Sequence, residues 1–386
     1  MTELLSYVKK RWWVIFVISI LCLILPYILR YYIHELPMAG EQSYDLARYV
    51  ELHSDTERDP LLPSRSVTFT PYHYLLKGIN YFFPFEFFQQ WLPLIFGLIT
   101  IVSMFFLMKQ IQMDDTTLVC IAIIMIFAPV TVFTFFIPDY TGMVIALFSV
   151  ALFLLNGKRY LSWIIGLLVL SFIPFFGIYE VVFCLGWLIV LFMYERKKPL
   201  LIGATLLIGG ITLLLLWKGP IYLVNHSPVV GSFFKESISD FGGRIGISAF
   251  MYVLAILGFF YAWKQKKKLY PLYGMCIVWF VIAGHHPLVY MFFSLVGAYF
   301  ASFLIRYLDK RIWSLPTLKN FTFLLLCCGL LFSYLTYVER IVEYGPSEGL
   351  VEALQWLEGY AKEEAIVFSH YVFIFGLMMH PEYFIY

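Results

Sequence analysis

The sequence predicts an all-α polytopic membrane protein with about eleven transmembrane helices. Hydrophobic residues make up 61% of the 386 residues and charged residues only 13%, whereas about a quarter of the residues in a soluble domain are charged. Apolar runs recur along most of the chain, and a helix of about 20 apolar residues crosses a bilayer core of roughly 30 Å. Basic residues gather in alternate connecting segments, as they do in proteins that cross a membrane repeatedly.

The same composition excludes several other classes of protein. Few charges and a formal net charge of +2 do not fit a disordered chain or a nucleic-acid binder that works through bulk positive charge. All six cysteines lie inside predicted spans without CxxC spacing, so we interpret them as packing residues rather than disulfide partners or metal ligands. The chain also has no GxxxxGK[ST] loop, which excludes nucleotide hydrolysis by that route.

The apolar runs define eleven candidate spans. The fourth, sixth and ninth are short, so we expect them to tilt, to lie in a thinned bilayer or to extend into their flanks. In chain order the spans are residues 12–29, 91–108, 118–137, 142–155, 161–176, 181–193, 200–217, 247–263, 269–283, 288–305 and 318–337.

Basic residues give the expected orientation. With the N-terminus inside, the inner segments carry 17 basic and five acidic residues, a net charge of +12. The outer segments carry the other ten basic and 20 acidic residues, a net charge of −10. Because cytoplasmic loops are enriched in Lys and Arg, we expect a cell-membrane protein with a cytoplasmic N-terminus and an extracytoplasmic C-terminus.

Two outer segments are too long to be simple connections. The first, residues 30–90, belongs to a predicted transmembrane domain of residues 1–337, and it is expected to form short helices at 43–53 and an amphipathic aromatic stretch at 72–88. The second, residues 338–386, is predicted as a small outer element with a helix at 349–360 and a strand-like run at 365–369.

Polar residues gather at the outer ends of the spans. No ionisable residue falls in the middle of a span, where an ion-coupled transporter usually needs one. Instead, Asp139, Glu180 and the pair His285–His286 lie in three different outer turns, and Glu41 and Asp45 lie in the first outer segment. The sequence therefore predicts a site that opens on the outer face.

At this point the sequence resembles a known family. The runs GEQSYDLARY at residues 40–49 and RDPL at 58–61 are followed by Arg65 and by PYHY at 71–74. They resemble the first outer loop of GT-C glycosyltransferases, particularly archaeal ones related to protein O-mannosyltransferases and to oligosaccharyltransferase catalytic subunits. These enzymes use sugars carried on polyprenyl phosphate or pyrophosphate. They place an acid in this loop and often a second between the third and fourth spans, where this chain has PDYTG at 138–142.

The resemblance implies an inverting, polyprenyl-phosphate-sugar-dependent glycosyltransferase. A carboxylate can deprotonate the acceptor hydroxyl, and cationic groups can stabilise the leaving phosphate. We expect Glu41 to be the general base, with Asp45 near it, and Asp139 to be a second catalytic acid or a metal ligand. Glu41 and Asp139 would hold a divalent cation, Mg²⁺ or Mn²⁺, if the enzyme uses one. The candidates for binding the donor phosphate are Arg48, Arg65, His73, His285 and His286.

Each of these residues also has an ordinary structural interpretation. Glu41 could be an acid favoured at a helix N-terminus, and Asp139 could cap the helix that follows it. Arg48 could pair with Asp45 or Glu51 on the surface, and His285–His286 could form an interfacial turn.

Other functions also stay open. The tail lacks the Trp-Trp-Asp signature of oligosaccharyltransferases, and it ends at Tyr386, so we expect an acceptor-recognition module to be missing or supplied by a partner. The expected partners are a polyprenyl-phosphate-linked sugar, a glycan, lipid or protein acceptor, and membrane lipids, without nucleic acid. The alternatives are a lipid-linked glycan flippase or exporter, a polysaccharide polymerase or ligase, and an inactive subunit of a glycosylation complex.

Overall fold

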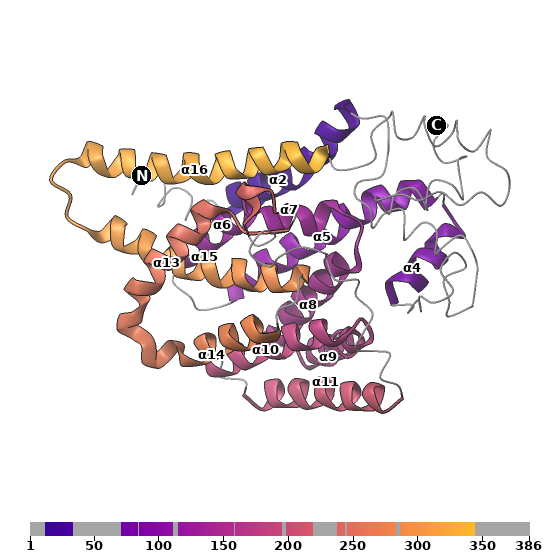
Figure 1. Cartoon of the computed structure of the whole chain (residues 1–386). Coiled ribbons are helices and arrows are strands. Elements are labelled where there is room, and N and C mark those ends of the chain that lie inside the picture. Colours follow the sequence, from indigo (N-terminus) through magenta and orange to yellow (C-terminus); the bar gives the residue numbers. More distant parts are fainter. Residues whose placement is uncertain are drawn as a thin grey trace.

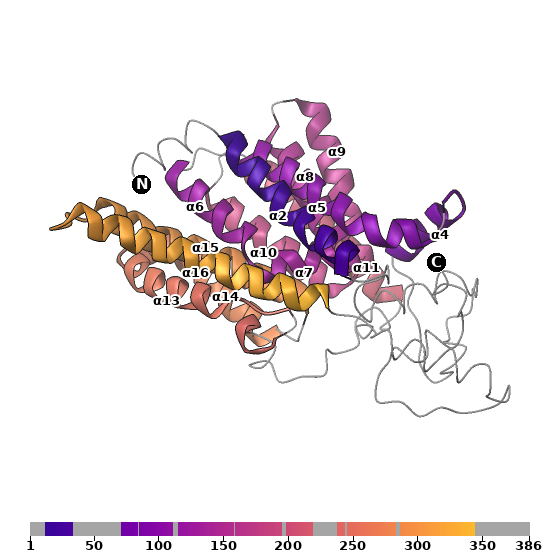
Figure 2. The same cartoon turned by 90° about the horizontal axis from the view of Figure 1, so that it is seen from above.

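The fold is a bundle of helices (Figures 1 and 2). The computed structural model describes residues 12–33, 71–83, 85–110, 115–157, 159–194, 198–218, 238–243, 245–282 and 286–343. Within these ranges every regular element is a helix, apart from one isolated β-bridge between Ile238 and Ile247. The predicted all-α class is therefore confirmed for this part of the chain.

A helix coincides with each of the eleven predicted apolar runs. The third run forms two helices, and α4 precedes the second run. The bounds are α2 Trp12–Ile33, α4 Pro71–Asn80, α5 Phe85–Gln110, α6 Asp115–Ile126, α7 Pro129–Phe136, α8 Tyr140–Asn156, α9 Tyr160–Phe172, α10 Ile178–Tyr194, α11 Lys198–Lys218, α13 Ala249–Ala262, α14 Lys266–Ile282, α15 Pro287–Lys310 and α16 Pro316–Val342, with short 3-10 turns η1 Ile173–Phe175, η3 Ser239–Phe241 and η4 Trp263–Gln265.

Helix length and composition agree with a membrane protein. Within the described residues, α2, α15 and α16 are long and apolar enough to cross a membrane, and α6 with α7 makes a fourth if the two count as one span. The other apolar helices are shorter, with apolar stretches of 10–17 residues. The count of eleven spans and their orientation therefore stay predictions.

The run at residues 118–137 was predicted as one span, and in the structure it forms two helices, α6 and α7. The chain bends by 58° between α6 and α7. Pro129 is the first residue of α7, and Ala128 before it has an extended backbone. Proline has no backbone N–H and pushes the preceding residue out of the helical region, so α6 must end here. The bend directs α7 toward the turn that contains Asp139.

Helix α15 lies at the centre of the bundle, between α13 and α6 (Figure 2). In its most apolar stretch 61% of the residues are buried, compared with 28% for α2 and 33% for α16. The contact with α13 is close because Gly258 has no side chain: a Cβ there would lie 2.0 Å from the carbonyl oxygen of Phe300. Small residues at helix interfaces allow backbones to approach in this way.

Buried hydroxyl groups are satisfied mainly within their own helices. Ser19, Thr100, Thr134, Ser149 and Thr212 each donate to a carbonyl oxygen three or four residues earlier. Such bonds satisfy polar atoms where no water is available. These side chains therefore do not build a polar path through the described part of the bundle.

A few polar contacts join helices that are distant in sequence. The Tyr27 hydroxyl donates to the Phe135 carbonyl at 2.6 Å and joins α2 to α7. The buried Arg30 donates through Nη1 to the Val342 carbonyl at 2.8 Å. It thereby satisfies one of the carbonyl groups that a helix C-terminus leaves without an intrahelical partner. The ends of α2 and α16 therefore meet.

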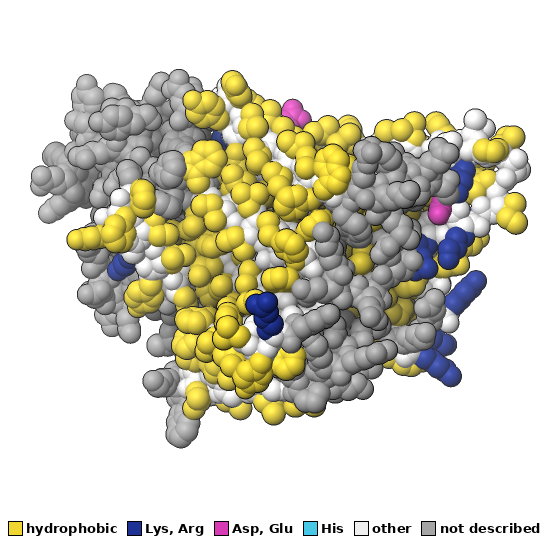
Figure 3. All heavy atoms as spheres, turned by 180° about the vertical axis from the view of Figure 1, so that it is seen from behind, with side chains coloured by type: hydrophobic (Ala, Val, Ile, Leu, Met, Phe, Trp, Pro, Cys, Tyr) yellow, Lys and Arg dark blue, Asp and Glu magenta, His cyan; other side chains and the backbone are white. Residues whose placement is uncertain are grey.

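The outer surface is largely apolar, as Figure 3 shows for one face. Leu206, Phe260 and Phe332 are each about 70% exposed in the isolated chain, and contiguous exposed apolar surface of this kind indicates contact with a membrane or a partner. We call the end of the bundle where α8, α10 and α15 begin the site end. The opposite end, with η4 and the α15–α16 turn, is called the basic end (Figure 1).

The close contact at Gly258 gives a first test. Replacing Gly258 by Ala places a methyl group against backbone atoms of Phe300 that cannot move aside, so we expect a loss of about 1–3 kcal/mol in stability. The matched control is Gly274→Ala in α14, where an added Cβ meets nothing within 4 Å. Thermal unfolding of both variants in detergent should show a lower melting temperature for Gly258→Ala alone; equal melting temperatures would contradict the proposed packing.

Candidate functional site

Three turns at the site end bring polar side chains together. Asp139 immediately precedes α8, Glu180 lies in the first turn of α10, and His286 immediately precedes α15. Glu180 and His286 are 0% and 6% exposed. We call Tyr140, Glu180 and His286 the buried polar cluster. The three turns thus meet at one end of the bundle, and the predicted opening of a site on the outer face stays a prediction.

Asp139 caps α8. Its backbone is extended, its Oδ1 accepts the Tyr140 N–H at 2.8 Å, and its Oδ2 accepts the Thr141 hydroxyl. The capping interpretation of Asp139 is therefore confirmed. A carboxylate has about four acceptor positions, so these two bonds leave it able to accept others. Its predicted catalytic role stays a prediction.

His286 is fixed by contacts on both ring nitrogens. Nδ1 accepts the Leu288 N–H at 3.3 Å, which caps α15. A neutral imidazole that accepts through Nδ1 carries its proton on Nε2. Nε2 lies 3.1 Å from the Tyr140 hydroxyl and 3.5 Å from Glu180 Oε1. The Nε2 proton is therefore directed at the other two members of the cluster.

Aromatic rings enclose the cluster. Tyr179 stacks on the His286 ring, with centroids 4.8 Å apart and planes inclined by 5°. Tyr140 lies against Phe176, with centroids 6.1 Å apart. The Tyr179 ring covers one face of the imidazole, and His286 is only 6% exposed, which strengthens the electrostatic interactions inside.

The N-termini of three helices surround the two carboxylates. Asp139, Glu180 and His286 lie at the starts of α8, α10 and α15. A helix N-terminus carries a partial positive charge and presents unpaired N–H groups. This arrangement favours negative charge at the site end.

Helix α4 brings the first outer segment to Asp139. Tyr72 and His73 are buried. Burial raises the pKa of the Tyr72 hydroxyl above its ordinary value, and the negative charge of the nearby Asp139 raises it further.

The predicted aromatic stretch at 72–88 is not one element. It divides into helix α4, which packs on the bundle, a short turn, and the first residues of α5, which begins before the predicted start at residue 91.

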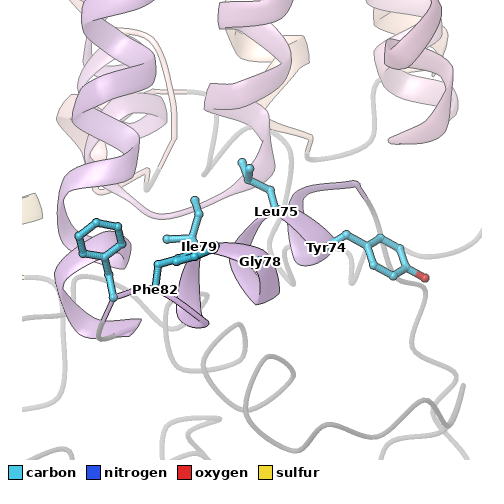
Figure 4. A pocket seen from close by; sticks show the side chains of 6 residues that line it. Tyr74, Leu75, Gly78, Ile79 and Phe82 are labelled. Atoms are coloured by element: carbon cyan, nitrogen blue, oxygen red, sulfur yellow. The ribbon is translucent and has the colours of Figure 1, made fainter.

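An apolar hollow of about 380 Å³ lies beside α4 and the turn that follows it. Figure 4 shows Leu75 and Ile79 on the side of α4 that faces the bundle, and Tyr74 pointing away from it. The hollow is lined by Tyr74, Leu75, Gly78, Ile79, Phe82 and Phe83.

Several predicted residues and segments lie outside the described residues. They are Glu41, Asp45, Arg48, Arg65 and His285, together with residues 43–53, 349–360 and 365–369. Of the predicted site residues, Asp139 and His286 come together with residues that had no assigned role, namely Tyr72, Tyr140, Tyr179 and Glu180. One signal in the sequence could have identified Glu180: it is the only acidic residue of an otherwise apolar helix, and it lies in the first turn of that helix.

A cation site is not formed by the described residues. Among them, no group of three or more His, Cys, Asp or Glu side chains lies close enough to hold a metal ion. Asp139 caps α8 and is able to accept further bonds, whereas His286 is engaged on both nitrogens. The predicted Mg²⁺ or Mn²⁺ would need Glu41, which lies outside the described residues, and no step below depends on it.

Comparison with known proteins gives no further assignment. No family model matches the chain, and no curated protein matches it.

The buried polar cluster gives a second test. Tyr140→Phe removes the hydroxyl between His286 and Glu180 and leaves buried polar atoms with fewer partners, so we expect a loss of about 1–3 kcal/mol. Tyr74→Phe makes the same change at a residue that is 64% exposed and should have almost no effect. Melting temperatures that fall equally in the two variants would show that the hydroxyl of Tyr140 has no special role.

Proposed function

We propose that the protein is an integral-membrane glycosyltransferase of the GT-C type. It transfers a sugar from a polyprenyl-phosphate-linked donor to an acceptor at the outer membrane face. The observation that carries the proposal is the position of Asp139, the family's second acid. It lies at the same end of the bundle as Glu180 and His286 and close to Tyr72 of the first outer segment.

The reaction needs one base and a stabilised leaving group. The acceptor oxygen forms a bond to the anomeric carbon, and the bond between that carbon and the donor phosphate oxygen breaks. The electron pair leaves with the polyprenyl phosphate, and the acceptor proton passes to a carboxylate. Glu41 is the proposed base, Asp45 lies four residues after it, and Asp139 is the proposed second acid.

The negative charge that develops on the phosphate has two proposed sources of stabilisation. The first is the partial positive charge of the helix N-termini at the site end. The second is the set of cationic candidates Arg48, Arg65, His73 and His285. His286, predicted as a further phosphate ligand, enters the proposal as a positioning residue, because contacts within the protein engage both of its nitrogens.

The arrangement of polar groups favours an enzyme over a flippase or exporter. A flippase needs a hydrophilic path across the membrane. In the described part of the bundle, buried hydroxyl groups bond to their own helices, and the buried carboxylate of Glu180 lies in the first turn of α10. Polar chemistry is thus concentrated at one end, as a reaction at one membrane face requires.

A transfer assay tests the proposal. The purified full-length protein is given polyprenyl-phosphate-linked sugars with glycan, lipid or peptide acceptors, and released polyprenyl phosphate is measured. Loss of a general base usually costs 10²–10⁴-fold in rate, so we expect Glu41→Gln to lose at least about 10²-fold while it still inserts into membranes. A wild-type protein that releases no polyprenyl phosphate from any donor would favour the inactive-subunit alternative.

Asp139 needs a test that separates chemistry from capping. Asn is as good an N-cap as Asp, so Asp139→Asn should keep the melting temperature but lose at least about tenfold in transfer rate. Asp139→Ala should lose both the activity and about 0.5–2 kcal/mol of stability. Full activity in Asp139→Asn would reduce Asp139 to a capping residue, and measurements with and without EDTA test the predicted cation.

We also propose the orientation with eleven spans and a cytoplasmic N-terminus. In a cysteine-free background, a cysteine introduced at Tyr81 should react with a membrane-impermeant maleimide in intact cells. A cysteine at Arg311 should react only after permeabilisation. The reverse pattern would overturn the orientation, and equal labelling at both sites in intact cells would contradict the proposed membrane arrangement.

A further inference from the structure

Two turns form one surface at the basic end. The first is η4 between α13 and α14, and the second joins α15 to α16. Tyr261 at the end of α13 and Tyr307 near the end of α15 hold them together, with ring centroids 4.6 Å apart. Dark blue side chains gather at one end of the molecule in Figure 3. We define the basic–aromatic surface by Lys264, Lys266, Lys267, Lys310 and Arg311 with Tyr261, Trp263, Tyr307 and Trp313.

Aromatic rings hold three of these cations in place. Lys264 Nζ lies 5.2 Å from the centroid of the Tyr261 ring, and Lys266 Nζ lies 5.4 Å from that of Trp263. The Arg311 guanidinium lies 5.7 Å from the Trp313 centroid. A cation within about 6 Å of a ring centroid is attracted by the ring. Each of these three charges therefore lies beside an aromatic ring that is close to it in sequence.

The surface carries an excess of positive charge. Asp309, which lies beside it, pairs with Lys319 at 2.9 Å, and Arg306 donates to Thr117 at 3.0 Å. The defining lysines Lys264, Lys266, Lys267 and Lys310, together with Arg311, are exposed. This distribution leaves their charges directed outward.

Exposed apolar residues accompany the charges. Ile312 is 96% exposed and Leu315 is 59% exposed, and both lie in the turn between α15 and α16. Tyr and Trp rings prefer the headgroup level of a bilayer, and apolar side chains beside them enter the acyl boundary. Cations held at the level of these rings therefore lie at the level of lipid phosphates.

We propose that the basic–aromatic surface binds the headgroups of anionic phospholipids in the leaflet at this end of the bundle. A net positive loop is sufficient to orient a membrane protein, but here two turns are joined through Tyr261 and Tyr307 and their cations are fixed by rings. Such a surface selects a headgroup with a net negative charge over a zwitterionic one. The proposal does not depend on the proposed transferase activity.

The test uses the full-length protein in a mild non-ionic detergent. Soluble dihexanoyl phosphatidylglycerol or dihexanoyl phosphatidylcholine is titrated below its micelle concentration, and bound lipids are counted by native mass spectrometry. We expect tighter binding of phosphatidylglycerol. The triple variant Lys264→Gln/Lys266→Gln/Lys267→Gln should bind it about tenfold or more weakly, since each basic residue near an anionic surface contributes about fivefold.

Two control variants decide what the effect means. Lys158→Gln/Arg159→Gln/Arg196→Gln removes the same charge from other predicted inner segments and should keep wild-type binding. Lys→Arg at positions 264, 266 and 267 keeps the charge and should also keep it, which separates lost charge from disturbed folding. Equal affinity for the two lipids, or an equal loss in the charge-matched control, would overturn the proposal.

Discussion

The imidazole of His286 joins three helices in an environment where polar groups must find partners within the protein. Its Nδ1 accepts the Leu288 N–H and caps α15, while its Nε2 faces Tyr140 of α8 and Glu180 of α10. Tyr179 covers one face of the ring. In an apolar bundle an unpaired donor or acceptor costs several kcal/mol. The starts of α8, α10 and α15 are therefore tied to one another, and Asp139, the residue before Tyr140, takes its position from this junction.

The two ends of the bundle differ in chemistry. Carboxylates and helix N-termini lie together at the site end, and this combination suits a reaction in which a carboxylate takes a proton and a phosphate leaves. Exposed lysines and aromatic rings lie at the basic end, where they suit contact with lipid headgroups. Between the ends, buried hydroxyl groups bond to their own helices. The proposed enzyme would therefore work at one membrane face and use the other end for its placement in the bilayer.

Most of the helices were predictable from the sequence, because they coincide with apolar runs, whereas α4 was predicted only as part of an amphipathic aromatic stretch. The break at Pro129 was not, since hydropathy averages over a proline that lies between two apolar stretches. The capping alternative for Asp139 after Pro138 could be read from the sequence, because capping is a local interaction. The contact of Glu180 with His286 joins residues more than a hundred positions apart, and no periodicity encodes which helix ends meet. The predicted roles of Glu41, Asp45, Arg48, Arg65 and His285 lie outside the described residues.

The bend between α6 and α7 is held by helices from both ends of the described chain. By hydropathy, residues 118–137 form a single apolar segment, which the sequence predicts as one span. The contacts that stabilise the bent form come from elsewhere: Tyr27 of α2 donates to the Phe135 carbonyl, and Tyr334 of α16 packs edge-on against Phe127, with centroids 5.5 Å apart. Helix α16 is the last described helix along the chain, and its Tyr334 therefore adds a contact distant in sequence to the break that Pro129 causes locally. Through α7, these contacts bear on the position of Asp139 before α8.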